Sequence, residues 1–570
     1  MEAGATDTTV EPPSVGAQTD EPNEPSNEPS NDGLRDGLRD RLARGLRAHP
    51  LAIALVVLST ITHLWQLGRR PLAHDEAIDA WFSWQARGMG VIKYDPVYHG
   101  PLRFYLEGFV LDHFGTTPGW TRVVAALAGI GATALIASSR RLLGNVGAPA
   151  AALLFTISPT ILTVTRTGRE DSLTGLVSLA LLVVIGNALV APRARHIVGA
   201  AALLAVSFTL KETTFLFGFA GACFVVGLVV VAVLRPDGHA RAFFRAMRQI
   251  GTMPWMWATV VFIALFMVVF TAVFRYGAGF ESGLVDGVKY WWRQHDVGRG
   301  NQRWFFYGTI YAGYEWLIVG FAAIGLMVAV RRRSVTGAWF ATMGLIQLVV
   351  YSWAGEKFAW LAIHPLLPVV LLAGVGAQAV FDRVRRADAT ITWVPHLVAG
   401  AAGVLVLATV IVAVPPAITN GADPRELLVT VQTSTAVPEL TDRLAAARRR
   451  GVLGPILVDN RDSGSWPWAW YLHDVADVGY QTIDPAQPLP AGFDAYIISA
   501  STEPPPIPAG YVMQRFALRS WWLPDYDHVS VADVLRWFVT RETWNPTASS
   551  DQFLIVTSGS GVLATAVAGG

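Results

Sequence analysis

The stretch FLFGFAGACFVVGLVVVAVL, residues 215–234, decides the fold because twenty residues in a row carry no charge. That is about the length that an α-helix needs to cross the hydrocarbon core of a bilayer. A soluble protein can bury one helix of this kind, but not several. This chain has five further apolar runs of similar length, at residues 51–67, 173–190, 255–274, 310–330 and 361–380. We therefore predict a polytopic α-helical membrane protein.

The composition of the whole chain agrees with this prediction. Of its 570 residues, 52% are hydrophobic and 15% are charged, whereas about 25% of the residues of soluble proteins are charged. The single cysteine, Cys223, lies inside an apolar run, which excludes a disulfide framework and a cysteine-rich metal site. We expect no nucleic-acid partner.

Hydropathy and the positive-inside rule together give the predicted topology. With the amino terminus in the cytoplasm, the dense arginine clusters fall on the inner side, for example at residues 235–248 and 331–333. Residues 101–115 are not counted as a span, because Arg103 and Glu107 are costly at the middle of a bilayer. We expect an amphipathic helix in the membrane interface there. The eleven predicted spans are residues 51–67, 121–137, 148–164, 173–190, 197–210, 214–234, 254–274, 310–330, 336–353, 361–380 and 394–414.

The chain divides into three predicted parts. Residues 1–34 hold eight acids and no base, with repeated prolines, which is typical of a disordered tail. We place this acidic tail in the cytoplasm. Residues 35–414 form the transmembrane domain, whose outer loop 68–120 contains interface helices. Residues 415–570 form the third part.

This third part is predicted to be a soluble α/β domain of common size. It has no span-length apolar run, and it contains 16 acids against 10 bases. An odd number of spans places it outside the cytoplasm. Short β-rich runs alternate with a helical pattern: the runs are residues 455–458, 495–499 and 553–557, and the helical pattern covers residues 437–450.

Once the topology is drawn, charged motifs gather at the outer ends of the spans. Ionisable groups at the rim of the membrane are functional candidates, although any one pair could simply be a solvated part of a loop. Several pairs at the same ends of successive hairpins favour a shared site. The motifs are His74-Asp75-Glu76, Arg169-Glu170-Asp171, Lys211-Glu212 and Glu356-Lys357, with His364 one turn further on.

The acidic pair predicts a division of tasks. Because Asp75 and Glu76 are adjacent, their side chains point about 100° apart on a helix and cannot form a tight dyad. One carboxylate could take a proton from an acceptor hydroxyl, while its neighbour orients a partner or binds a cation.

The chain has only four lysines, and all of them fall in outer loops or at span ends. A compact ammonium group suits a phosphate oxygen as a point charge, which makes these lysines candidates for a lipid-phosphate site. Chance placement is the alternative with so few residues. The four are Lys93, Lys211, Lys289 and Lys357.

At this point the motifs resemble a known superfamily. An acidic pair after the first span, then residues 99–102 (His-Gly-Pro-Leu), then residues 169–171 after a Ser158-Pro159 span, resemble the GT-C glycosyltransferases. These include protein O-mannosyltransferases and the bacterial aminoarabinose lipid A transferase. Closer still, residues 74–102, 169–172, 211–213 and 356–365 are similar to the archaeal flippase-activity-associated membrane proteins of this superfamily. The resemblance covers roughly residues 50–415.

The resemblance implies a fold, an activity and a set of partners. The activity is the inverting transfer of a sugar from a polyprenyl (dolichyl) phosphate donor to a hydroxyl of a glycan, lipid or protein, at the outer face of the cell membrane. Asp75 would be the general base, with Glu76 beside it. We expect Lys211, Lys357, Arg169 and Lys93 to bind the donor phosphate. We expect His74, His99, Glu170, Asp171, Glu212, Glu356 and His364 to support the site or bind the acceptor.

Two departures from the family pattern affect the prediction of a metal site. Residues 169–171 read Arg-Glu-Asp where relatives often have Arg-Pro-Asp, so Asp171 is the nearer equivalent of the family acid. No Asp-x-Asp follows the first span, which puts a metal requirement of the oligosaccharyltransferase kind in doubt. Mg²⁺, Mn²⁺ or Zn²⁺ could still bind to carboxylate and imidazole groups here. The candidate ligands are His74, Asp75, Glu76, His99 and Asp171.

Two other functions compete with sugar transfer. The first is a non-catalytic component of lipid-linked oligosaccharide translocation, which would keep the fold in order to bind the lipid carrier. The second is a secondary transporter, which would need ionisable groups near the span centres; Glu315 comes nearest to this. The arginine-rich chain with acidic soluble parts is compatible with a salt-adapted archaeal source.

Overall fold

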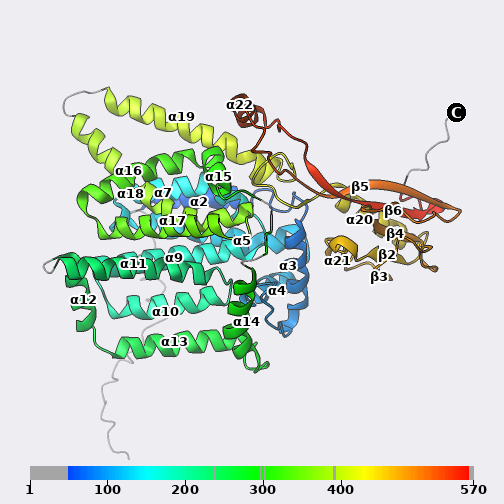
Figure 1. Ribbon diagram of the computed structural model, residues 1–570, viewed down its shortest axis with the longest axis horizontal. Helices are drawn as coiled ribbons and strands as arrows, with labels where there is room; N and C mark the ends of the chain where they lie inside the picture. Colours follow the sequence, from blue (N-terminus) through cyan, green and yellow to red (C-terminus); the bar gives the residue numbers. More distant parts are fainter. Residues whose placement is uncertain (1–48, 236–237, 295–296, 301, 389–392, 564–570) are drawn as a thin grey trace, which may run out of the picture. The chain divides into compact units, whose positions relative to one another are not determined.

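The computed structural model describes residues 49–235, 238–294, 297–300, 302–388 and 393–563. The predicted acidic tail, residues 1–34, lies outside the described residues. Long helices make up the first part of the chain, and a mixed sheet makes up the last (Figure 1).

Each of the eleven predicted spans coincides with helical structure. In the described part of the chain, seven helices are long and apolar enough to cross a membrane, or nine if each of two bent pairs is one span. Two shorter apolar helices, α2 (Pro50–Leu64) and α10 (Ala194–Phe208), occupy the remaining predicted positions. The seven are α5 (Pro118–Ser138), α9 (Glu170–Val190), α11 (Thr214–Leu234), α13 (Met253–Phe270), α17 (Val335–Trp353), α18 (Ile363–Asp388) and α19 (Val394–Val414).

The two bent spans meet at one buried carboxylate. The first consists of α7 (Gly147–Ile157) and α8 (Pro159–Thr165), bent by 65°, and the second of α15 (Phe306–Tyr314) and α16 (Trp316–Arg332), bent by 102°. Pro159 has no backbone N–H to donate, and so the helix is interrupted between α7 and α8. Glu315, at the second break, accepts hydrogen bonds of 2.8 Å from the Ser158 hydroxyl and from the Thr160 amide. The Glu315 carboxylate therefore satisfies the donors that the first break exposes.

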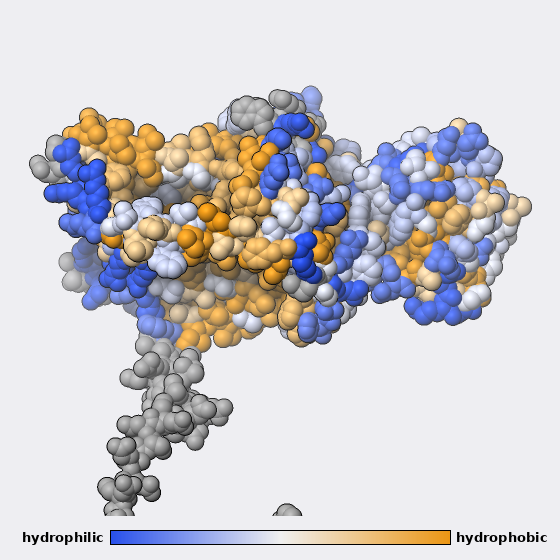
Figure 2. Space-filling view, turned by 90° about the horizontal axis from the view of Figure 1, so that it is seen from below, coloured by the Kyte–Doolittle hydropathy of each residue, from blue (hydrophilic) through white to orange (hydrophobic). Residues whose placement is uncertain are grey.

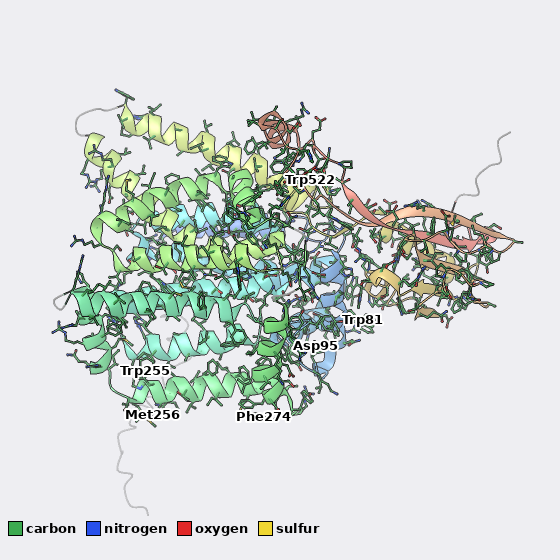
Figure 3. All side chains as sticks on the ribbon, viewed as in Figure 1. Trp81, Asp95, Trp255, Met256, Phe274 and Trp522 are labelled. Carbon is green, nitrogen blue, oxygen red and sulfur yellow. The ribbon has the colours of Figure 1, made fainter. Side chains whose placement is uncertain are left out.

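The surface of the helical part is that of a membrane protein. Figure 2 shows hydrophobic residues along the helices, hydrophilic residues at the two ends of the helical part, and a mixture of the two over the sheet. Exposed aromatic side chains lie at both ends of α13, with Trp255 at its start and Phe274 just beyond its end (Figure 3). Aromatic residues at two levels are typical of the two membrane–water interfaces. The predicted polytopic membrane fold is confirmed.

Two helices of the segment between the first two spans lie at one end of the helical part: α3 (His74–Gln85) and α4 (Leu102–Phe114). Arg103 and Glu107 of α4 are only 1% exposed, whereas Phe109 is 61% exposed. Helix α4 thus turns Arg103 and Glu107 into the protein, although apolar residues such as Phe109 lie outward. The charges that argued against a span are buried in pairs.

The last part of the chain forms a six-stranded sheet in the order β1-β5-β6-β4-β2-β3. Strand β2 is parallel to β3 and β4, and the other pairings are antiparallel. All three predicted strand runs and the predicted helix are present. The elements are β1 (Gln432–Thr433), α20 (Ala436–Arg449), β2 (Ile456–Asp459), α21 (Trp468–Tyr471), β3 (Val478–Gln481), β4 (Ala495–Ser499), β5 (Tyr511–Trp521), α22 (Val531–Thr540) and β6 (Ala548–Thr557).

Helix α3 contacts this last part of the chain. The Leu72 amide donates a hydrogen bond of 2.9 Å to the Tyr471 hydroxyl, and Leu72, Ala77 and Ala80 pack with Trp470 in one apolar cluster. The helix that carries the predicted acidic pair is therefore held from both sides, by the membrane helices and by the sheet domain.

Candidate active site

Most of the predicted site residues lie in one buried group of charged side chains at the end of the membrane helices. We call this group the charge cluster. It joins the first two turns of α3, the loop before α4, the first half of α4, the start of α9, the turn between α10 and α11, and the start of α18. Its members are Asp75, Asp79, His99, Arg103, Glu107, Arg169, Glu170, Asp171, Lys211, Glu212 and His364.

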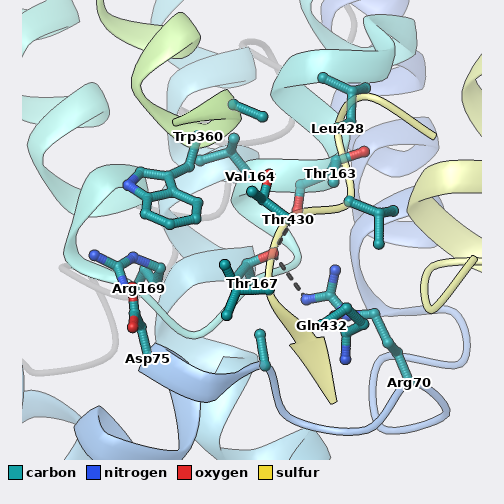
Figure 4. A pocket seen from close by; sticks show the side chains of 14 residues that line it. Arg70, Asp75, Thr163, Val164, Thr167, Arg169, Trp360, Leu428, Thr430 and Gln432 are labelled. Atoms are coloured by element: carbon teal, nitrogen blue, oxygen red, sulfur yellow. Dashed lines mark hydrogen bonds and ion pairs between the residues drawn. The ribbon is translucent and has the colours of Figure 1, made fainter. Parts of the chain in front are cut away.

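Arg169 stands at the centre of the charge cluster. Its guanidinium is 2.6 Å from Asp75, 3.2 Å from Glu170 and 3.5 Å from Asp171. It also lies over the Trp360 ring, 4.6 Å from the ring centre, so that it stands between Asp75 and this ring (Figure 4). Burial opposes the charged form, but the surrounding carboxylates raise the pKa of Arg169 well above its usual value. Arg169 is therefore a fixed cation.

Lys211 bridges the two acids at the start of α9. Its ammonium is 2.7 Å from Glu170 Oε1 and 2.7 Å from Asp171 Oδ1. The second partner of Asp171 is His364, whose Nε2 is 2.8 Å from the same oxygen. The predicted motifs at residues 169–171 and 211–212 and the predicted His364 thus come together.

A close backbone approach brings His99 to this group. The amides of Gly100 and Leu102 donate to the carbonyls of Leu210 and Thr209 at 3.1 Å. A side chain at Gly100 would meet the Thr209 carbonyl oxygen at 2.1 Å, so glycine is required there. This approach places His99 Nδ1 at 2.7 Å from Glu212 and Nε2 at 3.5 Å from Glu170.

The charge cluster also contains residues that the sequence analysis did not select. Arg103 is 2.7 Å from Asp79 and 2.8 Å from Glu107, and it donates to the Gly168 carbonyl at 2.8 Å. Two sequence signals point to them: Asp79 follows Asp75 by one helical turn, and Arg103 precedes Glu107 by one turn. Both pairs therefore lie on single helix faces.

The charge cluster has an excess of acid, since six carboxylates face three bases that carry a permanent charge. Burial, together with Glu170 and Asp75, raises the pKa of Asp79 to about 7, although Arg103 opposes this. Burial lowers the pKa of His99, but Glu170 and Glu212 outweigh it and leave that pKa raised. Bound protons therefore offset part of the excess negative charge.

Glu76 belongs to a separate, fully buried arrangement. Both of its oxygens bind Arg122, at 2.8 and 2.9 Å, and Arg70 is 3.3 Å away. The amides of Ala73 and Gly168 also donate to it. Burial alone would raise the pKa of Glu76, but the two arginines lower it to about 2. This carboxylate holds the start of α3 against the neighbouring spans, and it points away from Asp75, as their adjacency predicts.

Asp75 differs from every other carboxylate of the charge cluster in its exposure. Its side chain is 38% exposed, whereas the others are at most 7% exposed. It lines a cavity with Arg169 and Trp360, and the segment from Leu428 to Gln432 forms another wall (Figure 4). A carboxylate that is fixed at one oxygen and open to a cavity can accept a proton from a bound molecule.

A second and larger cavity, of about 800 Å³, lies beside His99. Its walls come from the loop between α3 and α4 and from α14 (Gly279–Gln294). Three of its lining side chains are bases: Lys93, Lys289 and Arg293. A series of side-chain contacts connects the two cavities. It runs from Asp75 to Arg169 (2.6 Å), from Arg169 to Glu170 (3.2 Å) and from Glu170 to His99 (3.5 Å).

Besides Glu76, four predicted site residues make their contacts outside the charge cluster. The Lys93 ammonium lies 5.6 Å from the centre of the Tyr276 ring, in the larger cavity. Lys357 donates to the Ala354 carbonyl at 2.5 Å, and Glu356 pairs by its backbone with Arg299. His74 is turned toward the sheet domain. Of these four residues, Lys93 is the one that lines one of the two cavities.

The candidate metal ligands do not converge. In the described part of the chain, no group of three or more His, Cys, Asp or Glu side chains is placed to hold a metal ion. Glu76 binds two arginines, and the Arg169 guanidinium contacts both Asp75 and Asp171. An arginine therefore fills the position between these carboxylates.

Comparisons with known proteins support the fold. A family model described as dolichyl-phosphate-mannose-protein mannosyltransferase matches residues 98–274. No curated protein matches the chain by sequence.

Solved structures match over more of the chain. ArnT from Cupriavidus metallidurans bound to undecaprenyl phosphate is 16% identical, with a TM-score of 0.53, over 89% of this chain and 98% of that one. AglB, an archaeal oligosaccharyltransferase from Archaeoglobus fulgidus, in complex with an inhibitory peptide and a dolichol-phosphate, is 11% identical, with a TM-score of 0.50, over 76% of this chain and 64% of that one. The chain is therefore a polytopic membrane protein with the fold of the GT-C glycosyltransferases.

Proposed function

We propose that this protein transfers a sugar from a polyprenyl (dolichyl) phosphate to an acceptor hydroxyl, with Asp75 as the general base. The observation that carries the proposal is the exposure of Asp75 within a cluster of otherwise buried carboxylates. Arg169 holds one of its oxygens at 2.6 Å, and Asp75 lines a small cavity, of about 40 Å³, at which an acceptor hydroxyl could reach it. The carrier class is supported by the family description and by the lipid phosphates bound to ArnT and AglB.

The proposed reaction is a single displacement. The acceptor oxygen attacks the anomeric carbon while the bond from that carbon to the phosphate oxygen breaks. The acceptor proton passes to Asp75, and the lipid phosphate leaves with its negative charge. Attack opposite to the leaving group inverts the configuration of the sugar.

The positive groups around the larger cavity suit the departing phosphate. His99, Lys93, Lys289 and Arg293 line that cavity, and they outnumber the two acids there, Asp95 and Asp286. A proton held on His99 by its two acidic neighbours adds to this positive charge. Stabilising charge where it develops in the transition state is a large term in enzyme catalysis. We place the donor phosphate in this cavity and the acceptor beside Asp75.

We further propose the orientation and the place of the reaction. The charge cluster and the sheet domain lie outside the cytoplasm of the cell membrane, the amino terminus lies inside, and the products are surface glycans or glycosylated proteins. If a divalent cation assists, the open oxygen of Asp75 would be its ligand from this chain, and the cation would supply additional positive charge to the reaction; sensitivity of transfer to a chelator tests this.

The experiment compares glycans and lipid-linked intermediates, by mass spectrometry, in cells with the native protein, with Asp75→Asn, and without the protein. Transfer in Asp75→Asn should fall by about 10²–10⁴-fold, the usual contribution of a general base. Asp112→Asn is the matched control, because Asp112 is an exposed acid of α4 outside the charge cluster. Its glycans should equal those of the native protein.

The competing function gives a different outcome. A flippase-associated protein that only binds the lipid carrier would tolerate Asp75→Asn in cells. Purified Asp75→Asn protein should still bind undecaprenyl phosphate or dolichyl phosphate under both hypotheses. A glycan profile that is the same with and without the protein would count against a sugar transferase, whichever lipid carrier or acceptor it used.

A further inference from the structure

A long groove lies at the end of the membrane helices opposite to the charge cluster. Helices α11 and α16 pack against α17, and a cavity of about 1070 Å³ lies between them. From Cys223 to Leu234, the side of α11 that lines this groove is apolar. Twelve residues of helix separate Cys223 from Arg235, a length of about 18 Å. That is close to the thickness of one leaflet of the hydrocarbon core, which is about 15 Å.

Small residues keep the groove open. Gly227, Ala329 and Ala338 line it, one from each of the three helices. A side chain built on Gly227 would meet no atom within 4 Å. The space beside Gly227 is therefore unfilled by protein.

The mouth of the groove is basic. Arg235 comes from the end of α11, and Arg332 and Arg333 come from the turn between α16 and α17. All three side chains are exposed. Among the described residues, no acid lines the groove and none of these three arginines forms an ion pair. Guanidinium groups bind phosphate oxygens through paired hydrogen bonds.

An amphipathic helix crosses the same end of the bundle. Helix α12 (His239–Gln249) exposes Arg241, Arg245 and Arg248, while Phe243 and Phe244 are partly buried. Figure 1 shows it running across the bundle between α11 and α13. A short helix with arginines on one face and aromatic residues on the other is typical of the headgroup region of a membrane. The mouth of the groove therefore lies at the level of the lipid phosphates.

We propose that this groove is a binding site for an anionic phospholipid. Its phosphate binds Arg235, Arg332 and Arg333, and one acyl chain lies along α11 past Gly227 toward Cys223. The groove suits a lipid rather than a free phosphate, because its basic mouth continues into an apolar channel about as deep as one leaflet. This site is at the far end of the helices from Asp75 and does not depend on sugar transfer.

The experiment measures lipid retained by the purified full chain, by native mass spectrometry, after reconstitution in phosphatidylcholine discs with increasing phosphatidylglycerol. The native protein should retain phosphatidylglycerol in preference to phosphatidylcholine. The triple variant R235Q/R332Q/R333Q should bind it on the order of 100-fold more weakly, about fivefold for each arginine. The variant Gly227→Phe, which keeps every arginine, should also lose the bound lipid because the ring fills the channel.

The control is R385Q/R386Q. Arg385 and Arg386 are exposed at the end of α18, outside the groove, and their removal should leave retention within twofold of native. Four results would overturn the proposal: equal retention of the two lipids by the native protein, native-like binding by the triple variant, native-like binding by Gly227→Phe, or displacement of the lipid by soluble glycerol phosphate. The triple variant should unfold at the native temperature, since the three arginines form no ion pair with the described residues.

Discussion

The Arg519 guanidinium, in strand β5 of the sheet domain, is 2.6 Å from Nδ1 of His74, the residue before the proposed base Asp75. The same arginine donates to the Asp462 carbonyl at 2.7 Å. Burial, with Arg519 and Arg169 nearby, lowers the pKa of His74 to about 4, although Asp75 opposes this. His74 is therefore neutral near pH 7, with Nδ1 free to accept. Through Arg519, the sheet domain thus contacts the first turn of α3 directly beside Asp75.

We predict that Arg519→Gln lowers kcat/KM for sugar transfer by about tenfold, because small displacements of a catalytic group are costly. The effect should fall mainly on kcat, since neither cavity is lined by Arg519. The measurement is transfer by purified protein at several acceptor concentrations. Arg519→Lys, which can still donate to His74, should recover part of the loss.

Arg515→Gln is the matched control. Arg515 lies on the same strand but pairs with Asp551 at the surface, at 2.9 Å. Its removal should leave kcat/KM unchanged. If Arg519→Gln and Arg515→Gln behave alike, the contact with His74 does not position Asp75.

The sequence was sufficient for the spans but not for the contacts between distant parts. Twenty apolar residues suffice to predict a membrane helix, because each helix satisfies its own backbone donors and acceptors. The grouping of Asp75, Arg169 and Lys211 also followed, because the ends of successive hairpins meet at one face. Arg519 could not be found in this way, since it lies 445 positions from His74 and no local pattern marks it.

The charges of α4 show a second limit of sequence reasoning. Arg103 and Glu107 were used only to argue that residues 101–115 do not span the membrane. The structure buries both among Asp79 and Glu170. Whether such charged side chains are buried as ion pairs depends on neighbours from other helices, which the local sequence does not show. Lys357 is a further example: its sequence environment resembles that of Lys211, but its side chain donates to the nearby Ala354 carbonyl.

We predict that Arg169→Lys reduces transfer at least 100-fold, although the charge is kept. An ammonium group cannot reach Asp75, Glu170 and Asp171 while also stacking on Trp360, because only the planar guanidinium has that geometry. A loss of this size corresponds to about 3 kcal/mol of transition-state stabilisation. Single-turnover kinetics with the purified variant measure it.

Arg87→Lys provides the comparison for this change. Arg87 also lies 4.6 Å from the centre of an indole ring, that of Trp84, but it contacts no carboxylate of the charge cluster. Transfer by Arg87→Lys should match the native rate. Similar losses in the two variants would mean that stacking alone matters, and that Arg169 does not act through Asp75.

Lys211 and Lys357 should respond differently to loss of charge. Lys211→Met leaves Glu170 and Asp171 without their shared cation, and removing one partner of a buried ion pair costs about 3–5 kcal/mol. We therefore expect lower yield, a lower unfolding temperature and loss of transfer. Lys357→Met should keep native stability and native transfer, because its ammonium donates to the Ala354 carbonyl and lines neither cavity. Thermal unfolding in detergent and donor titration separate the two; equal stability losses contradict this prediction.

From the lowered pKa of Glu76 we predict that the folded protein loses stability in acid. Its pKa falls from 4.5 to about 2 on folding, so its contribution is fully present above pH 4.5 and is lost as the pH falls toward 2. The shift corresponds to about 3 kcal/mol. Glu76→Gln should be less stable than native protein at pH 7 and should show a flatter stability curve between pH 4.5 and 2. The exposed Glu439→Gln should follow the native curve.

From the raised pKa of Asp79 we predict the opposite dependence of stability on pH, in a different pH range. Burial raises its pKa from 3.8 to about 7, so the folded state holds this proton more tightly than the unfolded chain does. Its contribution to stability is therefore present below pH 3.8 and is lost as the pH rises from 3.8 to about 7. Asp79→Asn cannot ionise and should remove this decline, so that the variant gains on the native protein between pH 4 and 7. Unfolding temperatures recorded across that range decide the matter, and parallel curves for the two proteins would show that Asp79 is already ionised in the folded state.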